Sequence, residues 1–218
     1  MYARESISRR RLVTSLGGAA VMVVAPRILA DLVLTPRQTA GPFYPDRLPL
    51  DTDNDLLRVN DAAAQAAGEV TWVSGRILDI HGEPQRGAQV EIWQVDRNGV
   101  YLHSQSGDQE RRDAAFQGYG RCLTNEDGAY YFRTVKPVPY GFRTAHIHFG
   151  VRQRGATRLF TTQMYVRGEP GNARDRLLNS ISDQRARDAV IVAFVPTAPG
   201  SGELAARFDI VLGATPEA

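Results

Sequence analysis

The segment 145–151, in which apolar residues alternate strictly with histidine or glycine, constrains the fold of this chain more than any other feature. Its apolar side chains fall on one parity, and two histidines, His146 and His148, fall on the other. Because alternate residues of a strand point to the same face, the segment predicts a strand with one buried face and two imidazoles about 7 Å apart on the other. Each imidazole disfavours protonation of its neighbour, and metals bind the neutral ring. The pair therefore indicates a metal site, whereas a single strand histidine is more often a structural hydrogen-bonding residue.

Other short segments with strand character recur along the chain, separated by turns such as Asn98-Gly99 and Asn125-Glu126-Asp127-Gly128. Many short strands joined by turns are typical of a β-sandwich or barrel. We therefore predict an all-β fold, a β-sandwich with long connecting loops. The predicted strands cover residues 70–78, 88–95, 120–124, 130–135, 145–152, 158–166, 189–194 and 206–212.

Helical patterns are scarce, and only residues 173–180, after Pro170-Gly171, predict a short helix. Residues 31–67 contain few periodic segments and are interpreted as an N-terminal arm on a domain that spans 31–218. Trp72 and Trp93 are predicted to lie in the core. The single cysteine, Cys122, excludes an internal disulfide and a cysteine-based metal cage, and it is interpreted as a packed thiol.

Residues 1–30 have the pattern of an export signal. Arg9, Arg10 and Arg11 precede an apolar run, 12–25, and one small residue, Ala30, ends the segment. Paired arginines before a Gly/Ala-rich run resemble a twin-arginine signal, so we predict export to the periplasm or the exterior. The run is shorter than the roughly 20 apolar residues of a transmembrane helix, so no stable membrane span is expected. An uncleaved anchor or a disordered tail is the alternative interpretation.

The basic character of the chain is also concentrated in this leader. The whole chain has a net charge of +2, but residues 1–30 contain five arginines and one glutamate, so the remainder is at −2. No basic stripe interleaved with aromatic residues remains outside the leader, and nucleic acid is therefore not an expected partner.

Two tyrosines accompany the histidines in the sequence. Tyr140 lies six residues before His146, and Tyr101 follows a glycine-containing turn. Taken alone, Tyr101 is better interpreted as a core aromatic and Tyr140 as the end of a turn. Together with the histidines, tyrosine oxygens indicate a hard, highly charged ion such as Fe(III), although neutral histidine pairs also suit Zn, Cu or Ni.

An ordered series of motifs resembles the intradiol ring-cleavage dioxygenases, most of all the protocatechuate 3,4-dioxygenase branch. The resemblance covers residues from about Thr39 to beyond Gly168. Its motifs are Gly75-Arg76-Ile77-Leu78-Asp79, Val90-Glu91-Ile92-Trp93-Gln94, Gly99-Val100-Tyr101, Gly118-Tyr119-Gly120-Arg121, Thr134-Val135-Lys136-Pro137 and His146-Ile147-His148-Phe149.

This resemblance implies a mononuclear non-haem Fe(III) held by Tyr101, Tyr140, His146 and His148. Tyr140 resembles the tyrosine that leaves the iron when substrate binds and then acts as a base. The implied reaction opens a catechol-type ring between its two hydroxyl-bearing carbons with O2, giving a cis,cis-muconate-type diacid.

Further site residues follow from the same resemblance. Arg143 resembles the arginine beside the bound catechol, and Gln163 matches a glutamine that orients an iron ligand. The residues Gly41, Pro42, Phe43 and Tyr44 resemble a segment that lines the substrate pocket. His103 lies close to Tyr101 in sequence and is assigned no role.

The chain also departs from the family pattern. Only Gly141 and Phe142 separate Tyr140 from Arg143, where the protocatechuate enzymes carry a longer insert, so protocatechuate itself is not the expected substrate. The helical N-terminal segment of the catechol 1,2-dioxygenases is also missing. Relatives in the protocatechuate branch pair two similar chains, which implies either a homo-oligomer or pairing with a similar subunit.

Two other interpretations stay open at this point. The segments 75–90 and 124–137 also resemble transthyretin-like β-sandwich modules, which would make the protein an exported binding module with a vestigial metal site. A zinc or copper hydrolase-like site is the third interpretation, although no carboxylate is placed near the histidines as a ligand or base. The complete set of two tyrosines and two histidines favours the enzyme.

Overall fold

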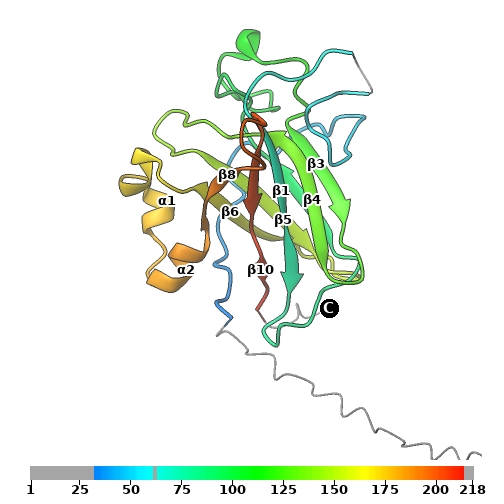
Figure 1. Ribbon diagram of the computed structural model, residues 1–218, viewed down its shortest axis with the longest axis vertical. Coiled ribbons are helices and arrows are strands. Elements are labelled where there is room, and N and C mark those ends of the chain that lie inside the picture. Colours follow the sequence, from blue (N-terminus) through cyan, green and yellow to red (C-terminus); the bar gives the residue numbers. More distant parts are fainter. Residues whose placement is uncertain (1–31, 61–62, 214–218) are drawn as a thin grey trace, which may run out of the picture. The chain divides into compact units, whose positions relative to one another are not determined.

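The computed structural model of the protein describes residues 32–60 and 63–213. It has ten strands, two short α-helices and two 3-10 turns within these residues (Figure 1). The strands are β1 Val70–Leu78, β2 Gln89–Trp93, β3 Tyr119–Leu123, β4 Ala129–Val135, β5 His146–Arg152, β6 Phe160–Val166, β7 Ile191–Val192, β8 Phe194–Pro196, β9 Leu204–Arg207 and β10 Ile210–Val211. The helices are α1 Arg176–Asn179 and α2 Gln184–Ala189, and the 3-10 turns cover Gln109–Arg111 and Pro170–Ala173.

The strands form two mixed sheets. In one sheet β1 is central, with β4 antiparallel on one side, β9 and β10 parallel along the other, and β8 beside β9. The second sheet has the order β3-β2-β5-β6-β7. The turn at Asn125–Gly128 carries the chain from β3 in one sheet to β4 in the other, and Gly128 takes the positive φ of 69° that this turn requires.

The hydrophobic core lies between the two sheets. Val73 and Phe132 from the first sheet share one buried cluster with Ile147, Phe149 and other residues of the second sheet. The Phe149 ring lies 5.2 Å from that of Phe208. Alternation therefore buries one face of each sheet against the other, which confirms the predicted all-β sandwich and the buried parity of the segment 145–151.

The strand predictions are confirmed to within two residues for the first six strands. The C-terminal part differs from the prediction. Residues 184–189 form the helix α2, the predicted strand at 189–194 is replaced by β7 and the start of β8, and the predicted strand at 206–212 is replaced by the end of β9 and by β10. The predicted helix at 173–180 is shortened to α1. Its N-cap is Asp175, whose carboxylate accepts the backbone N–H groups of Leu177 and Leu178.

Trp72 was predicted to be a core residue, and this prediction is wrong. Trp72 has the outward parity of β1 and is 37% exposed. Its indole N–H donates to Glu203 at 2.8 Å, and the guanidinium of Arg133 lies over its ring. Trp93 is fully buried, as predicted, in a second cluster with Val95, Tyr101 and Tyr119.

The predicted leader, residues 1–30, lies outside the described residues. Among the residues that the structure describes, no helix is both long and apolar enough to cross a membrane.

Candidate metal centre

Strand β5 presents both histidines on one face at the middle of its sheet. His146 and His148 have ring centroids 4.8 Å apart, and their Nε2 atoms are separated by 3.2 Å. The backbone of β5 pairs with β2 on one side and with β6 on the other. His148 lies in both ladders, opposite Trp93 and Gln163, and His146 lies in the β6 ladder, opposite Tyr165. Both side chains are almost completely buried.

The surroundings also fix how each ring is oriented. The Nδ1 atom of His146 lies 2.6 Å from the Thr144 carbonyl oxygen, which can only accept, so Nδ1 carries the proton and Nε2 keeps a free lone pair. His148 stacks on Trp93 with the rings 5.0 Å apart and nearly parallel. Gly41 closes over His148, since a Cβ atom at this position would lie 3.2 Å from the histidine Cε1.

Both candidate tyrosines reach the histidines from loops. The phenol oxygen of Tyr101 lies 3.1 Å from His148 Nε2 and 3.4 Å from His146 Nε2, and the Tyr140 oxygen lies 3.4 Å from that of Tyr101. Donor atoms held about 2.0–2.1 Å from one metal ion in tetrahedral directions are about 3.3 Å apart. The structure thus brings the four predicted ligands together at a spacing that fits one metal ion.

Burial sets the protonation of these groups in the absence of a metal. Desolvation, with a further contribution from Arg143, lowers the pKa of His146 to about 4, and desolvation together with His146 places the pKa of His148 well below its usual value. Desolvation and the neighbouring Tyr140 raise the pKa of Tyr101 well above its usual value. The imidazoles are therefore ready to bind a metal, whereas the Tyr101 phenol loses its proton only to a strongly charged cation.

The tyrosines are needed to complete such a site. Within residues 32–60 and 63–213, no group of three or more His, Cys, Asp or Glu side chains is placed to hold a metal ion. Two imidazoles alone do not form a complete coordination sphere. The phenol oxygens of Tyr101 and Tyr140 are the further donors that the structure places beside His146 and His148.

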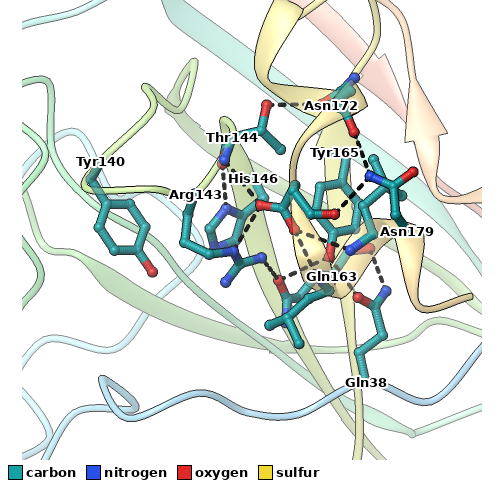
Figure 2. A network of polar contacts seen from close by, with 12 residues as sticks. Gln38, Tyr140, Arg143, Thr144, His146, Gln163, Tyr165, Asn172 and Asn179 are labelled. Carbon is teal, nitrogen blue, oxygen red and sulfur yellow. Dashed lines mark hydrogen bonds and ion pairs between the residues drawn. The ribbon is translucent and has the colours of Figure 1, made fainter.

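A polar network supports the centre from one side (Figure 2). Arg143 donates through Nε to Asp175 at 2.8 Å and through a terminal nitrogen to Gln163 Oε1 at 2.6 Å. Gln163 stands opposite His148 in the β5–β6 ladder and donates to the Thr39 carbonyl oxygen. Arg143 and Gln163 thus contact each other, and Gln163 links Arg143 to the arm that carries Gly41.

Asp175 is the residue of this network that the sequence did not reveal. Its carboxylate is fully buried and accepts from Arg143, from the backbone N–H of Thr144, and from two N–H groups of α1. Burial works to raise the pKa of Asp175, but these hydrogen bonds, led by that of Arg143, lower it overall. An aspartate before a short helical segment indicates a helix N-cap, so the capping role of Asp175 could be predicted from the sequence. Its ion pair with Arg143 could not.

A pocket of about 410 Å³ opens beside Tyr140, which is the one candidate ligand among its lining residues. Its walls include three of the four arm residues predicted to bind substrate, Gly41, Pro42 and Phe43, together with Tyr140 and Arg143. The fourth residue, Tyr44, does not line this pocket. Its hydroxyl donates to Glu91 at 2.9 Å and its ring packs edge-on against Trp93. His103 packs against Phe43 and is likewise absent from the pocket lining.

Comparisons with known proteins agree with this combination of fold and site. The family model described as "Dioxygenase" matches residues 39–214. The protocatechuate 3,4-dioxygenase beta chain of Burkholderia cepacia is 36% identical over 168 residues, covering 73% of this chain and 71% of that one. The corresponding alpha chain of Pseudomonas putida is 31% identical over 191 residues, covering 81% and 90%.

A solved structure is also similar. The dioxygenase domain of a dioxygenase carbohydrate-binding protein fusion from Streptomyces sp. SirexAA-E has a TM-score of 0.63 and 28% identity, covering 84% of this chain and all of that domain. Fold and site thus define an oxygenase built on a β-sandwich. The chain belongs to the intradiol ring-cleavage dioxygenase family.

Proposed function

We propose that the protein is a non-haem Fe(III) dioxygenase that opens a catechol-type ring between its two hydroxyl-bearing carbons with O2 and releases a cis,cis-muconate-type diacid. The observation that carries this proposal is the convergence of four donor atoms: those of Tyr101, His146 and His148 lie 3.1–3.4 Å from one another, and the Tyr140 oxygen lies 3.4 Å from that of Tyr101. These residues would hold the iron, because two phenolates balance much of the charge of a trivalent ion while two neutral imidazoles complete its ligands.

When bound, ferric iron supplies a Lewis acid and electron acceptor for the two catechol oxygens, so that the ring itself becomes the partner of O2. The role of the chain is to position and deprotonate the substrate. Tyr140 is the more exposed of the two tyrosines and lines the pocket, whereas Tyr101 is buried. The Tyr140 oxygen is therefore placed to accept a proton from a catechol hydroxyl.

Arg143 is the cation nearest to this reaction. It lines the pocket three residues from His146, and the hydrogen bonds to Asp175 and Gln163 hold its guanidinium in one orientation. A fixed positive group in a partly dry pocket stabilises negative charge that develops on the ring, without any reorganisation during the reaction. Gln163 orients Arg143 and has its amide nitrogen occupied by Thr39.

A non-catalytic binding module is not favoured, because such a module has no need for a complete set of donors and because the family model spans 39–214. We also propose that the protein is exported through a twin-arginine route and that it assembles with itself or with a similar subunit. The first proposal rests on the leader, and the second on the relatives that are named alpha and beta chains.

The proposed function predicts a visible absorption band from tyrosinate-to-Fe(III) charge transfer in the purified protein. Catechol added without O2 should move this band to longer wavelength, and admission of O2 should then yield the diacid. Tyr101→Phe should lose the band and the activity together. The matched control is Tyr119→Phe, since Tyr119 is a buried tyrosine of the same cluster that is not one of the four donors. A wild-type protein that stays colourless after ferric reconstitution would refute the proposal.

A further inference from the structure

Much of the lining of the pocket beside Tyr140 is apolar. Pro42, Phe43, Phe142 and Leu177 contribute carbon surface to its lining. Phe142 is 83% exposed, which is unusual for a phenylalanine and leaves most of its ring uncovered at the pocket mouth. An apolar group bound here would cover part of this surface and gain hydrophobic free energy.

The position of Phe142 is set by a tight turn. Tyr140 and Arg143 exchange two backbone hydrogen bonds, of 2.9 and 3.2 Å, so that only Gly141 and Phe142 form the connection. Gly141 takes a φ of +52°, a left-handed conformation that side chains disfavour. Phe142 is thus held at the tip of a short turn between a candidate iron ligand and the pocket arginine.

The pocket holds one positive charge, and that charge is already paired. Among the described residues that line it, Arg143 is the only charged one. Its guanidinium is paired with the fully buried carboxylate of Asp175 at 2.8 Å, and a terminal nitrogen donates to Gln163. A ring substituent that points away from Arg143 therefore meets apolar walls and no second cation among these lining residues.

Resting on the proposed function, we propose that this pocket selects catechols with an uncharged, apolar ring substituent and rejects those with a carboxylate. Phe142 and Leu177 are the residues assigned to this specificity. A carboxylate in this position would lose water without gaining a cation, which is unfavourable. A methyl-sized group that becomes buried gains about fourfold in binding.

The test compares substrates on one preparation of the iron-loaded full chain. We expect kcat/KM for 4-methylcatechol and 4-ethylcatechol to equal or exceed that for catechol, and kcat/KM for 3,4-dihydroxybenzoate to be at least about tenfold lower than for catechol. Cleavage of 3,4-dihydroxybenzoate as fast as 4-methylcatechol would overturn the specificity. Failure to cleave any of the four would instead refute the proposed function, so the two failures are distinguishable.

A charge introduced at the pocket mouth tests the assignment of Phe142. Because this side chain is exposed, Phe142→Lys should fold normally, and it should raise kcat/KM for 3,4-dihydroxybenzoate relative to 4-methylcatechol by about tenfold or more. The control is Tyr131→Lys, at an aromatic residue of β4 that is 58% exposed and does not line the pocket. The control should leave the ratio unchanged. An unchanged ratio in Phe142→Lys would refute the role of Phe142.

Discussion

The buried ion pair between Arg143 and Asp175 allows a sharp test of what holds the centre in place. Substitution of Asp175 by Asn removes the charge but leaves one side-chain oxygen in place. Asparagine caps helices about as well as aspartate, so the N–H groups of Leu177 and Leu178 can keep an acceptor. The change is therefore directed at the other carboxylate oxygen.

That oxygen, Oδ2, accepts from Arg143 Nε at 2.8 Å and from the Thr144 N–H at 3.0 Å. In Asp175→Asn an NH2 group would face these two donors, and the guanidinium of Arg143, which is 8% exposed, would lose its counter-charge. Removal of one partner from a buried pair costs about 3–5 kcal/mol. For a chain of this size, 1 kcal/mol shifts Tm by about 2–4 °C, so a decrease of about 6–20 °C is expected.

The assay is urea and thermal unfolding of the metal-free protein, so that iron binding does not contribute. The control is Glu126→Gln, because Glu126 pairs with Arg86 at 3.0 Å but both side chains are mostly exposed. Exposed pairs contribute no more than about 1 kcal/mol. If Asp175→Asn lost no more stability than Glu126→Gln, the argument that this pair fixes Arg143 would be wrong.

Two further predictions concern the fold and the acid response. Gly75→Ala should lower the free energy of unfolding in urea by about 3 kcal/mol or more, because the added Cβ would lie 1.9 Å from the Phe208 carbonyl oxygen. Gly107→Ala is the control and should cause no such loss, because a Cβ atom there would meet no atom within 4 Å. The metal-free protein should lose stability as pH falls from about 6.5 towards 4. In that range His146 binds a proton in the unfolded chain but not in the folded protein, where burial lowers its pKa to about 4. The free energy of unfolding should therefore fall by about 3 kcal/mol on account of this residue. The free energy of unfolding should depend less steeply on pH in His146→Gln, and an equal dependence in both proteins would contradict the prediction.

The sequence predicted those features that depend on local pattern. The alternation in 145–151 revealed which face of β5 packs into the core between the sheets and that both histidines share the other face, because a strand has a period of two residues. Motif resemblance placed Tyr101 and Tyr140 with the histidines, and the structure brings all four together.

Features that depend on tertiary contacts could not be predicted in this way. Asp175 lies 32 residues from Arg143, and no local pattern indicates that the two form a buried pair. Trp72 is a different case, because the alternation of β1 already places it on the face opposite Val73 and Ile77, and the prediction of a core residue overlooked this parity. Tyr44 follows Phe43 directly, yet it packs against Trp93 rather than in the pocket, because the chain turns at residues 42–44 and the two side chains leave it in different directions.

The way each donor is held indicates which of the four can be exchanged. His146 and His148 are fixed by the central strand of a sheet, and Tyr101 is buried, with its backbone N–H bound to the Ser106 hydroxyl. Tyr140 instead belongs to a two-residue turn beside the pocket and is partly exposed. Movement of the Tyr140 side chain breaks no strand pairing, and it removes one partly exposed ring from the edge of the cluster that contains Tyr101. Under the proposed function, Tyr140 would therefore be the donor that gives way to a substrate oxygen, while the other three would keep the centre intact.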